Sequence, residues 1–273
     1  MSVIWVAIVA FMAGAVNAVA GGGTFLTFPA LTGIAQLSEK VANMTSTIGL
    51  WPGSAASVLA AKNEYRRLPA GMLVLYCLLS VAGGGLGAWL LLITSPQTFR
   101  LVIPWLLAFA TVLFACSKPI ARWAGRGHGN RSLKWTFMVA AIQLAVAVYG
   151  GYFGAGIGVL MLAGLSFAGL DDIHQMNAMK VILATLINLV AAVIFLIQGR
   201  HEISWNYAGW MALASIIGGF FGMVGGRRLH PDQLRLFIIA VGVGLSCYYF
   251  YHAYGHHEHD RSRSLSPMSY HLS

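Results

Sequence analysis

Apolar residues dominate the chain in long runs that are separated by short polar or glycine-rich stretches. The runs cover residues 3–20, 24–37, 41–61, 69–93, 99–117, 135–153, 157–170, 173–198, 204–224 and 234–254. A helix rises 1.5 Å per residue, so about 20 apolar residues cross the ~30 Å hydrocarbon core of a bilayer. Eight runs approach or exceed this length, whereas 24–37 and 157–170 fall short of it. The pattern predicts about eight spanning helices if the short pieces are re-entrant, and up to ten if they cross.

The second part of the chain repeats the first at an almost constant offset of 134 or 135 residues. The matched pairs are Gly23/Gly158, Asn43/Asn177, Ser46/Lys180, Gly83/Gly218, Gly84/Gly219, Gly87/Gly222 and Pro96/Pro231. Such self-similarity predicts two homologous transmembrane repeats, residues 1–118 and 135–255. Residues 119–134 form a basic linker that is expected to be cytoplasmic. Residues 256–273 form a polar, His-rich tail that is expected to be disordered.

The composition agrees with a membrane protein. Of 273 residues, 58% are hydrophobic and only 9% are charged, against about 25% charged in soluble domains. The mean hydropathy is +0.72. We therefore predict an all-α integral membrane protein, and we exclude a soluble enzyme, a disulfide scaffold and a disordered chain. The sequence contains no recognisable catalytic motif, and no cofactor is expected.

The net charge of +9 comes from basic residues in the loops, so no nucleic-acid partner is expected. Basic residues gather in 62–67 and 118–134, which two spans separate. Both loops should therefore lie on one side of the membrane, and the positive-inside rule makes that side cytoplasmic. Inverted repeats would add Arg227, Arg228 and Arg235 to this side. Parallel repeats would add Arg200, Arg261 and Arg263, so charge does not choose between the two arrangements.

Each short apolar segment follows a glycine cluster at the equivalent place in its repeat. Short, glycine-interrupted segments in matching positions are typical of a transporter's binding site. Glycine allows the chain to turn at membrane depth, and the helix that follows would present free N–H groups to an anion. The alternative is close helix packing. The candidate binding residues are Gly21, Gly22, Gly23 and Thr24 in the first repeat, and Gly154, Gly156 and Gly158 in the second.

One apolar run, 173–198, contains an ionisable residue, Lys180, together with two amides. At 100° per residue Asn177 and Asn188 lie within about 20° of each other, with Lys180 about 60° to one side. An ionisable residue inside a span is a functional candidate. The alternative is that the lysine stem lifts its charge to the membrane interface. The matching run of the first repeat offers the candidates Asn43, Thr45 and Ser46.

None of the eight acidic residues lies within the core of an apolar run. A transporter of cations, or one that relays protons through carboxylates, would be expected to hold an acid at depth. The sequence therefore favours a small anion as the transported partner, with the lipid bilayer as its surroundings. The tail residues His256, His257 and His259 offer a weak alternative, metal binding, but no metal site is predicted.

The stretch AGAVNAVAGGGTFLTFPAL, followed by Asn43-Met44-Thr45-Ser46, resembles the sulfite exporter TauE/SafE family of membrane permeases. The second-repeat stretch GGYFGAGIGVLMLAGLS, followed by MNAMK, is similar to that family's repeated motif. The resemblance covers about residues 3–254. It implies a multi-pass permease of the plasma membrane, in practice a bacterial inner membrane, that handles sulfite, sulfonates or related anions. The second repeat departs from the first at Pro29, where Gly164 stands, so the two broken segments need not have the same shape.

Residues and resemblance together predict a secondary transporter of small anions, with sulfite, a sulfonate or a related sulfur-containing anion as substrate. One alternative is a membrane scaffold that transports nothing, against which the short loops argue. The other is a metal-cation exporter that uses the His-rich tail. The anion, the direction of transport, the coupling ion and the oligomeric state stay open.

Overall fold

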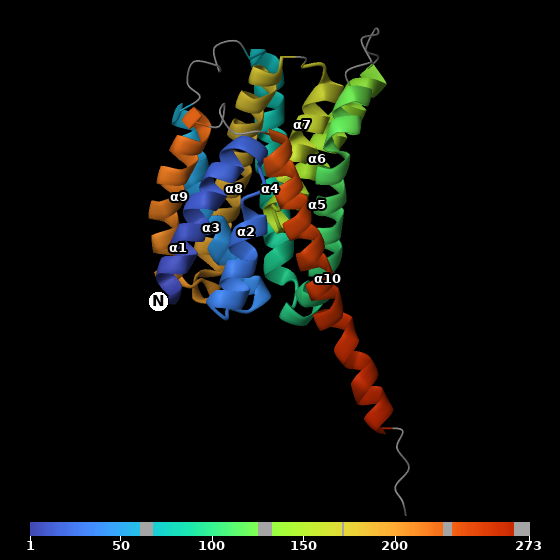
Figure 1. The fold of residues 1–273 in the computed structure, drawn as a ribbon. Helices are drawn as coiled ribbons and strands as arrows, with labels where there is room; N and C mark the ends of the chain where they lie inside the picture. The colour runs from blue at the N-terminus through green and yellow to red at the C-terminus, as the bar shows by residue number, and fades with distance from the viewer. Residues whose placement is uncertain (61–67, 125–132, 171, 226–230, 265–273) are drawn as a thin grey trace, which may run out of the picture.

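The computed structural model describes residues 1–60, 68–124, 133–170, 172–225 and 231–264, and all regular structure in these ranges is helical (Figure 1). The first repeat contains α1 (Ser2–Ala20), α2 (Thr24–Pro29), the π-helical turn η1 (Ala30–Ile34), α3 (Glu39–Ala60), α4 (Ala70–Ile93) and α5 (Pro96–Ala124). The second contains α6 (Leu133–Tyr152), α7 (Ile157–Ala168), α8 (Ile173–Gln198), the 3-10 turn η3 (Arg200–Glu202), α9 (Trp205–Gly225) and α10 (Pro231–Ser264).

Seven helices in the described ranges are long and apolar enough to cross a membrane. The eighth long helix, α3, has 22 residues but is less apolar, because hydroxyl and amide side chains follow Glu39 and Lys40. The two remaining apolar helical segments, Thr24–Ile34 and Ile157–Ala168, are short. The prediction of an all-α membrane protein with about eight long helices and two short segments is confirmed.

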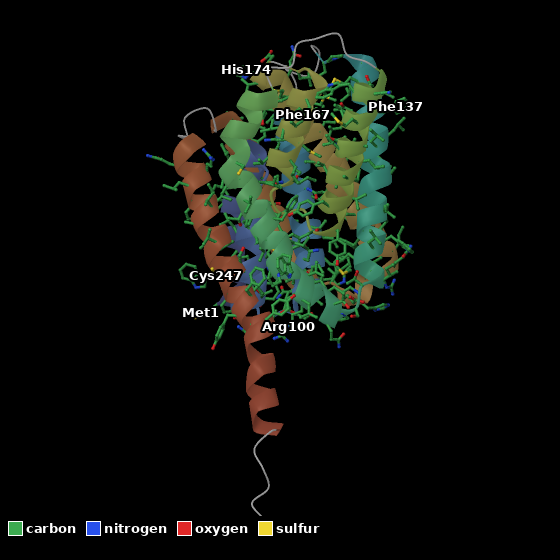
Figure 2. The ribbon with its side chains drawn as sticks, turned by 90° about the vertical axis from the view of Figure 1, so that its right-hand side faces the viewer. Met1, Arg100, Phe137, Phe167, His174 and Cys247 are labelled. Atoms are coloured by element: carbon green, nitrogen blue, oxygen red, sulfur yellow. The ribbon has the colours of Figure 1, made fainter. Side chains whose placement is uncertain are left out.

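The two repeats run in opposite directions through the bundle. At the lower end of Figure 1, Ser2 at the start of α1 contacts Tyr207 at the start of α9, with 3.0 Å between their hydroxyl oxygens. At the upper end, the indole N–H of Trp135 at the start of α6 donates to Phe167 O at the end of α7, 3.0 Å away. Figure 2 places Met1 and Arg100 at the lower end and His174 and Phe167 at the upper end. Each helix therefore begins at the end opposite to its counterpart, so the repeats are inverted.

The fourth helix of each repeat packs against the other repeat. α9 lies on α1 and α3, and α4 lies on α6 and α8. The paired glycines found in the sequence make these contacts possible, because a Cβ on Gly218 would lie 2.0 Å from Phe11 O and one on Gly83 would lie 2.6 Å from the Ala147 Cβ. The repeated glycine pairs are therefore packing positions, and the repeats interlock rather than stand side by side.

The outer surface is rich in large apolar side chains, as expected for a protein surrounded by lipid. Exposed tryptophans gather toward the lower end, where such side chains mark a membrane interface. They are Trp5, Trp89, Trp105, Trp205 and Trp210.

Two sequence predictions about the helix ends differ from the structure. α5 continues to Ala124 and α6 begins at Leu133, so helix extends into both ends of the predicted linker 119–134, and residues 125–132 lie outside the described part. α10 continues to Ser264 and projects beyond the bundle (Figure 1), so this part of the tail is helical rather than disordered. Hydropathy detects only the part of a helix that lies in the membrane. The apolar run therefore ends at residue 254, although the helix continues through the polar and charged residues that follow. Residues 265–273 and the side chains of the tail histidines lie outside the described part.

Candidate functional site

The glycine-containing breaks of the two repeats touch each other. Gly21, with φ +72°, ends α1, and Gly156, with φ +75°, precedes α7. The Gly158 N–H donates to Gly21 O over 3.4 Å. A Cβ on Gly21 would lie 2.4 Å from Gly158 Cα, so two glycines are needed for this approach. We call residues Gly21–Thr24 and Gly154–Gly158 together the crossing.

Aromatic and aliphatic side chains of α5 and α10 cover one side of the crossing. The ring of Phe114 lies 3.0 Å from the position of a Cβ on Gly22 and 3.1 Å from that of a Cβ on Gly156. Phe25 packs edge-on against Phe114, with 5.7 Å between the ring centroids. Ile238 completes this contact from α10. The crossing is therefore closed against this face of the bundle by apolar packing.

The crossing contains backbone donors that the protein itself does not use. Within the described residues, the N–H groups of Gly22, Gly23 and Thr24 donate no hydrogen bond to a protein acceptor, and neither do those of Ala155 and Gly156. The Thr24 side chain is partly exposed, and its Oγ1 lies 4.0 Å from the position of a Cβ on Gly154. Such donors beside a helix start suit an oxyanion.

Lys180 binds the end of α1 rather than reaching an interface. Its side chain is only 1% exposed, and its ammonium donates to Ala18 O at 3.2 Å and Val19 O at 2.9 Å. Both carbonyls belong to the last turn of α1, where a helix presents unsatisfied acceptors and partial negative charge. The snorkelling alternative is wrong, because the charge stays inside the bundle next to the crossing.

The candidates on α3 divide between two places. Asn43 Nδ2 donates to Tyr152 O, the last carbonyl of α6, at 2.9 Å. Ser46 Oγ lies 2.6 Å from the Thr27 Oγ1 of α2, and both side chains are buried. Thr45, in contrast, accepts a hydrogen bond from Ser204 N at 3.1 Å and so supports the start of α9.

The polar residues expected to share one face of α8 do not meet at a single site. Asn177 Nδ2 lies 4.0 Å from Met223 Sδ of α9, whereas Lys180 reaches α1. Asn188 makes no hydrogen bond within the described residues. The roles of Asn177 and Asn188 in binding stay predictions, and the structure gives neither of them a contact with the crossing.

Three polar residues outside the predicted binding set connect helices of the bundle. Thr27 lies in the short helix α2 and binds Ser46. Asn17 of α1 donates to Ser54 Oγ at 2.9 Å, which ties α1 to α3. Lys40 is 6% exposed. The sequence gives no sign of this burial beyond the position of Lys40 directly before the apolar run 41–61.

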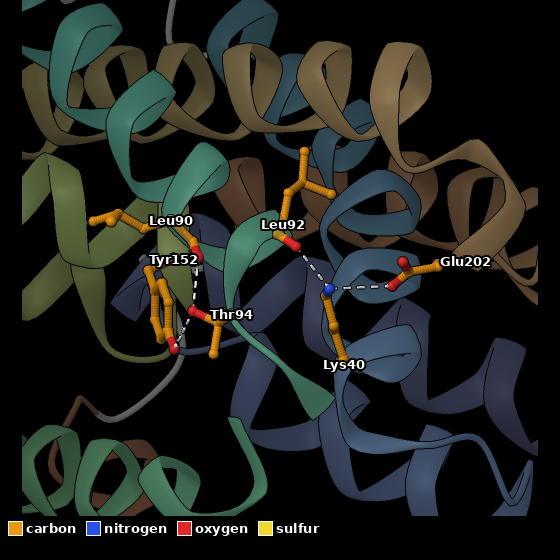
Figure 3. A network of polar contacts seen from close by, with 6 residues as sticks. All are labelled: Lys40, Leu90, Leu92, Thr94, Tyr152 and Glu202. Atoms are coloured by element: carbon orange, nitrogen blue, oxygen red, sulfur yellow. Dashed lines mark hydrogen bonds and ion pairs between the residues drawn. The ribbon is translucent and has the colours of Figure 1, made fainter. Parts of the chain in front are cut away.

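Figure 3 shows that Lys40 holds the lower end of the bundle together. Its ammonium donates to Leu92 O at 2.9 Å and lies 3.4 Å from a Glu202 carboxylate oxygen. In the same view Thr94 Oγ1 donates to Leu90 O at 2.7 Å and accepts from the Tyr152 hydroxyl at 3.4 Å. This network fixes the end of α4 relative to α3, α6 and the α8–α9 connection.

A cleft of about 490 Å³ opens at the lower end between η1 and α10. Thr32, Glu39, Tyr249 and His252 are among its lining residues. Thr32 Oγ1 lies 2.7 Å from the Tyr249 hydroxyl and closes the cleft toward the interior. Behind this contact Phe28 packs on Tyr249 and on Phe153, with centroid distances of 5.5 and 5.6 Å. Phe153 directly precedes Gly154, so a row of aromatic side chains connects the cleft with the crossing.

A comparison with protein families decides the identity of this inverted-repeat bundle. The family described as sulfite exporter TauE/SafE matches residues 6–249, nearly the whole chain. The chain belongs to the sulfite exporter TauE/SafE family. The resemblance seen in the glycine motifs is therefore confirmed.

Two curated relatives of this TauE/SafE protein carry transporter names. A probable membrane transporter protein ORF9 from a Sinorhizobium species is 27% identical over 240 residues, which cover 86% of this chain and 88% of the relative. A probable membrane transporter protein from Haemophilus influenzae is 25% identical over 219 residues, with 78% and 81% covered. No solved structure matches the chain. Family and relatives point to a multi-pass membrane transporter rather than an enzyme.

Proposed function

We propose that this TauE/SafE protein is a secondary transporter of a small anion, with sulfite or a sulfonate as substrate, and that the anion binds at the crossing. The observation that carries the proposal is the buried charge of Lys180. Among the described residues no carboxylate lies within ion-pair distance of its ammonium. A buried charge without a counter-ion is costly. An anion at the crossing would supply that counter-ion.

The crossing also supports the proposal through its hydrogen-bond donors. The free N–H groups of Gly22 to Thr24, Ala155 and Gly156 would replace water around an oxyanion. Among the described residues, the buried charged side chains are those of Lys40 and Lys180, and no Asp or Glu is buried. A cation substrate would therefore meet a positive site. Inverted repeats suit the rest of the mechanism, since movement of one group of helices against another would expose a central site to each side in turn.

The cleft at the lower end fits an access route for the anion. The Thr32–Tyr249 hydrogen bond and the Phe28 contacts would close this route in the conformation described here. Opening on this side would move η1 away from α10. Opening on the other side would use the equivalent surfaces of α7 and α5, which also pack together.

Purified protein in liposomes is expected to take up radiolabelled sulfite with saturable kinetics, above the level of protein-free liposomes. Unlabelled methanesulfonate and sulfoacetate, added in excess, test whether sulfonates compete for the same site. Chloride at the same concentration controls for ionic strength. If folded protein takes up none of these anions, the proposed substrate class is wrong.

The upper end of the bundle is expected to face the cytoplasm, because the segments that join the upper helix ends carry most of the basic residues. In a background in which Cys77, Cys116 and Cys247 are replaced by Ser, we introduce Gln97→Cys at the lower end and His174→Cys at the upper end. Both positions are exposed. A membrane-impermeant maleimide should label intact cells of the first variant and label the second only after lysis. The reverse pattern would invert the orientation.

A further inference from the structure

The equivalent helix ends of the two repeats are capped by different chemistry. At the end of α1, the Lys180 ammonium binds Ala18 O and Val19 O. At the end of α6, the Asn43 amide binds Tyr152 O. One helix end therefore binds the ammonium group of a lysine, and the other binds only a neutral amide.

The position equivalent to Lys180 in the first repeat is Ser46, at an offset of 134 residues. The Ser46 hydroxyl is 0% exposed and engaged with Thr27 Oγ1 at 2.6 Å. It brings no charge to the end of α6. Since the two helix ends have the same partial negative charge, the first repeat lacks the cation that the second repeat carries.

Oxygen acceptors without donors are left at this helix end. Asn43 is 1% exposed, and its Oδ1 has no hydrogen-bond partner. The orientation of the amide is fixed, because Tyr152 O can only accept and so requires Nδ2. The carbonyls of Gly150, Gly151 and Phe153 likewise accept no hydrogen bond from the described residues.

Neutral oxygens suit an alkali cation better than a proton. Amide and carbonyl oxygens do not titrate in the physiological range, so they cannot store a proton. Among the described residues no Asp or Glu is buried that would favour a divalent ion. Helix ends and unwound carbonyls at membrane depth are typical ligands for Na⁺ in transporters.

We propose that Asn43 Oδ1 and the free carbonyls at the end of α6 bind one Na⁺, which is transported with the anion. This inference rests on the proposed anion transport and adds its coupling ion. In this arrangement the ammonium of Lys180 is fixed to the chain on one side of the crossing and Na⁺ is an exchangeable cation on the other. A divalent anion such as sulfite would be balanced by the two together.

The first test compares driving forces in liposomes with the same external sulfite concentration. An inward Na⁺ gradient at equal pH is compared with choline in place of Na⁺, and with an inward proton gradient in choline. We expect the Na⁺ gradient to raise initial uptake by at least about fivefold, the lower end of usual coupling between sites. Uptake that responds only to the proton gradient, or to neither gradient, overturns the proposal.

The second test uses Asn43→Ala, with Asn177→Ala as the matched control at the equivalent position of the other repeat. Asn43→Ala should lower the ratio of Na⁺-driven uptake to choline uptake to about one. Asn177→Ala should keep the wild-type ratio, because the hydrogen bond that Asn177 makes within the described residues goes to Met223 Sδ, at 4.0 Å. If the ratio is unchanged in Asn43→Ala, Asn43 Oδ1 does not bind the coupling ion, and the proposed Na⁺ site is wrong.

Binding can be measured without transport, which separates the two proposals. A ligand that binds only the folded state raises the melting temperature. Wild-type protein should melt at a higher temperature in NaCl than in choline chloride of equal concentration. This comparison uses the wild type alone, so it decides whether Na⁺ binds even if Asn43→Ala does not fold. Na⁺-dependent melting without uptake of any anion would refute the proposed function and keep the cation site. Sulfite uptake without any effect of Na⁺ on melting or flux would refute the cation site and keep the proposed function.

Discussion

Replacing Lys180 with Met is expected to reduce sulfite flux at least about tenfold, which corresponds to about 1.4 kcal/mol. Met has a similar volume but no charge, so the substitution removes the counter-ion of the anion and leaves Ala18 O and Val19 O without a donor. Hydrogen bonds to charged groups contribute about 1.5–3 kcal/mol, so some loss of stability is also expected. Initial rates in liposomes, corrected for the amount of folded protein, give the flux. The melting temperature in detergent gives the stability.

Lys40→Met is the matched control for this variant. Lys40 is also buried and also donates to a carbonyl in the last turn of another helix, Leu92 O, but it lies at the lower end and has Glu202 beside it (Figure 3). We expect both variants to lose stability and only Lys180→Met to lose flux. If the two variants have equal flux per folded molecule, the role of Lys180 is to cap α1 and nothing more.

The positions of the helices follow from the sequence because the membrane leaves few options. Backbone groups in a bilayer must be satisfied within the segment, so each apolar run becomes helical, and most helix ends lie within a few residues of the ends of the run. The run 173–198 corresponds to α8 residue for residue, and Asp172 caps it through a hydrogen bond from His174 N at 2.9 Å. The inverted arrangement could not be derived in this way, because charge balances equally well in both schemes.

The contacts within the site were only partly predictable. The glycine clusters indicate where the helices break, but nothing in the sequence tells that Gly21 meets Gly158. The partners of Lys180 are backbone carbonyls, which carry no sequence signal. Thr45 and Ser46 were grouped as site candidates, yet neighbouring residues on a helix point about 100° apart. Thr45 therefore binds the start of α9 while Ser46 faces α2.

Substituting Ala for Gly158 is expected to damage the crossing more than any conservative change elsewhere in α7. The new Cβ would lie 2.6 Å from Gly21 Cα and 2.7 Å from Ala20 O. These neighbours are backbone atoms, so the contact can be relieved only by separating α1 from α7. Overpacking costs about 1–3 kcal/mol and occasionally more, and we expect the upper end of this range. The separation would also break the hydrogen bond from Gly158 N to Gly21 O and move the donors apart.

Gly164→Ala is the control, because it introduces the same methyl group into the same helix. Its Cβ would meet nothing closer than the Ile142 Cγ2 at 3.8 Å, an ordinary contact. Ala is favoured over Gly in a helix by about 1 kcal/mol, so this variant should be as stable as the wild type or slightly more stable. Melting temperatures in detergent and sulfite uptake in liposomes measure both effects. Equal stability of the two variants would mean that α1 and α7 do not touch at Gly158, and the site at the crossing would lose its basis.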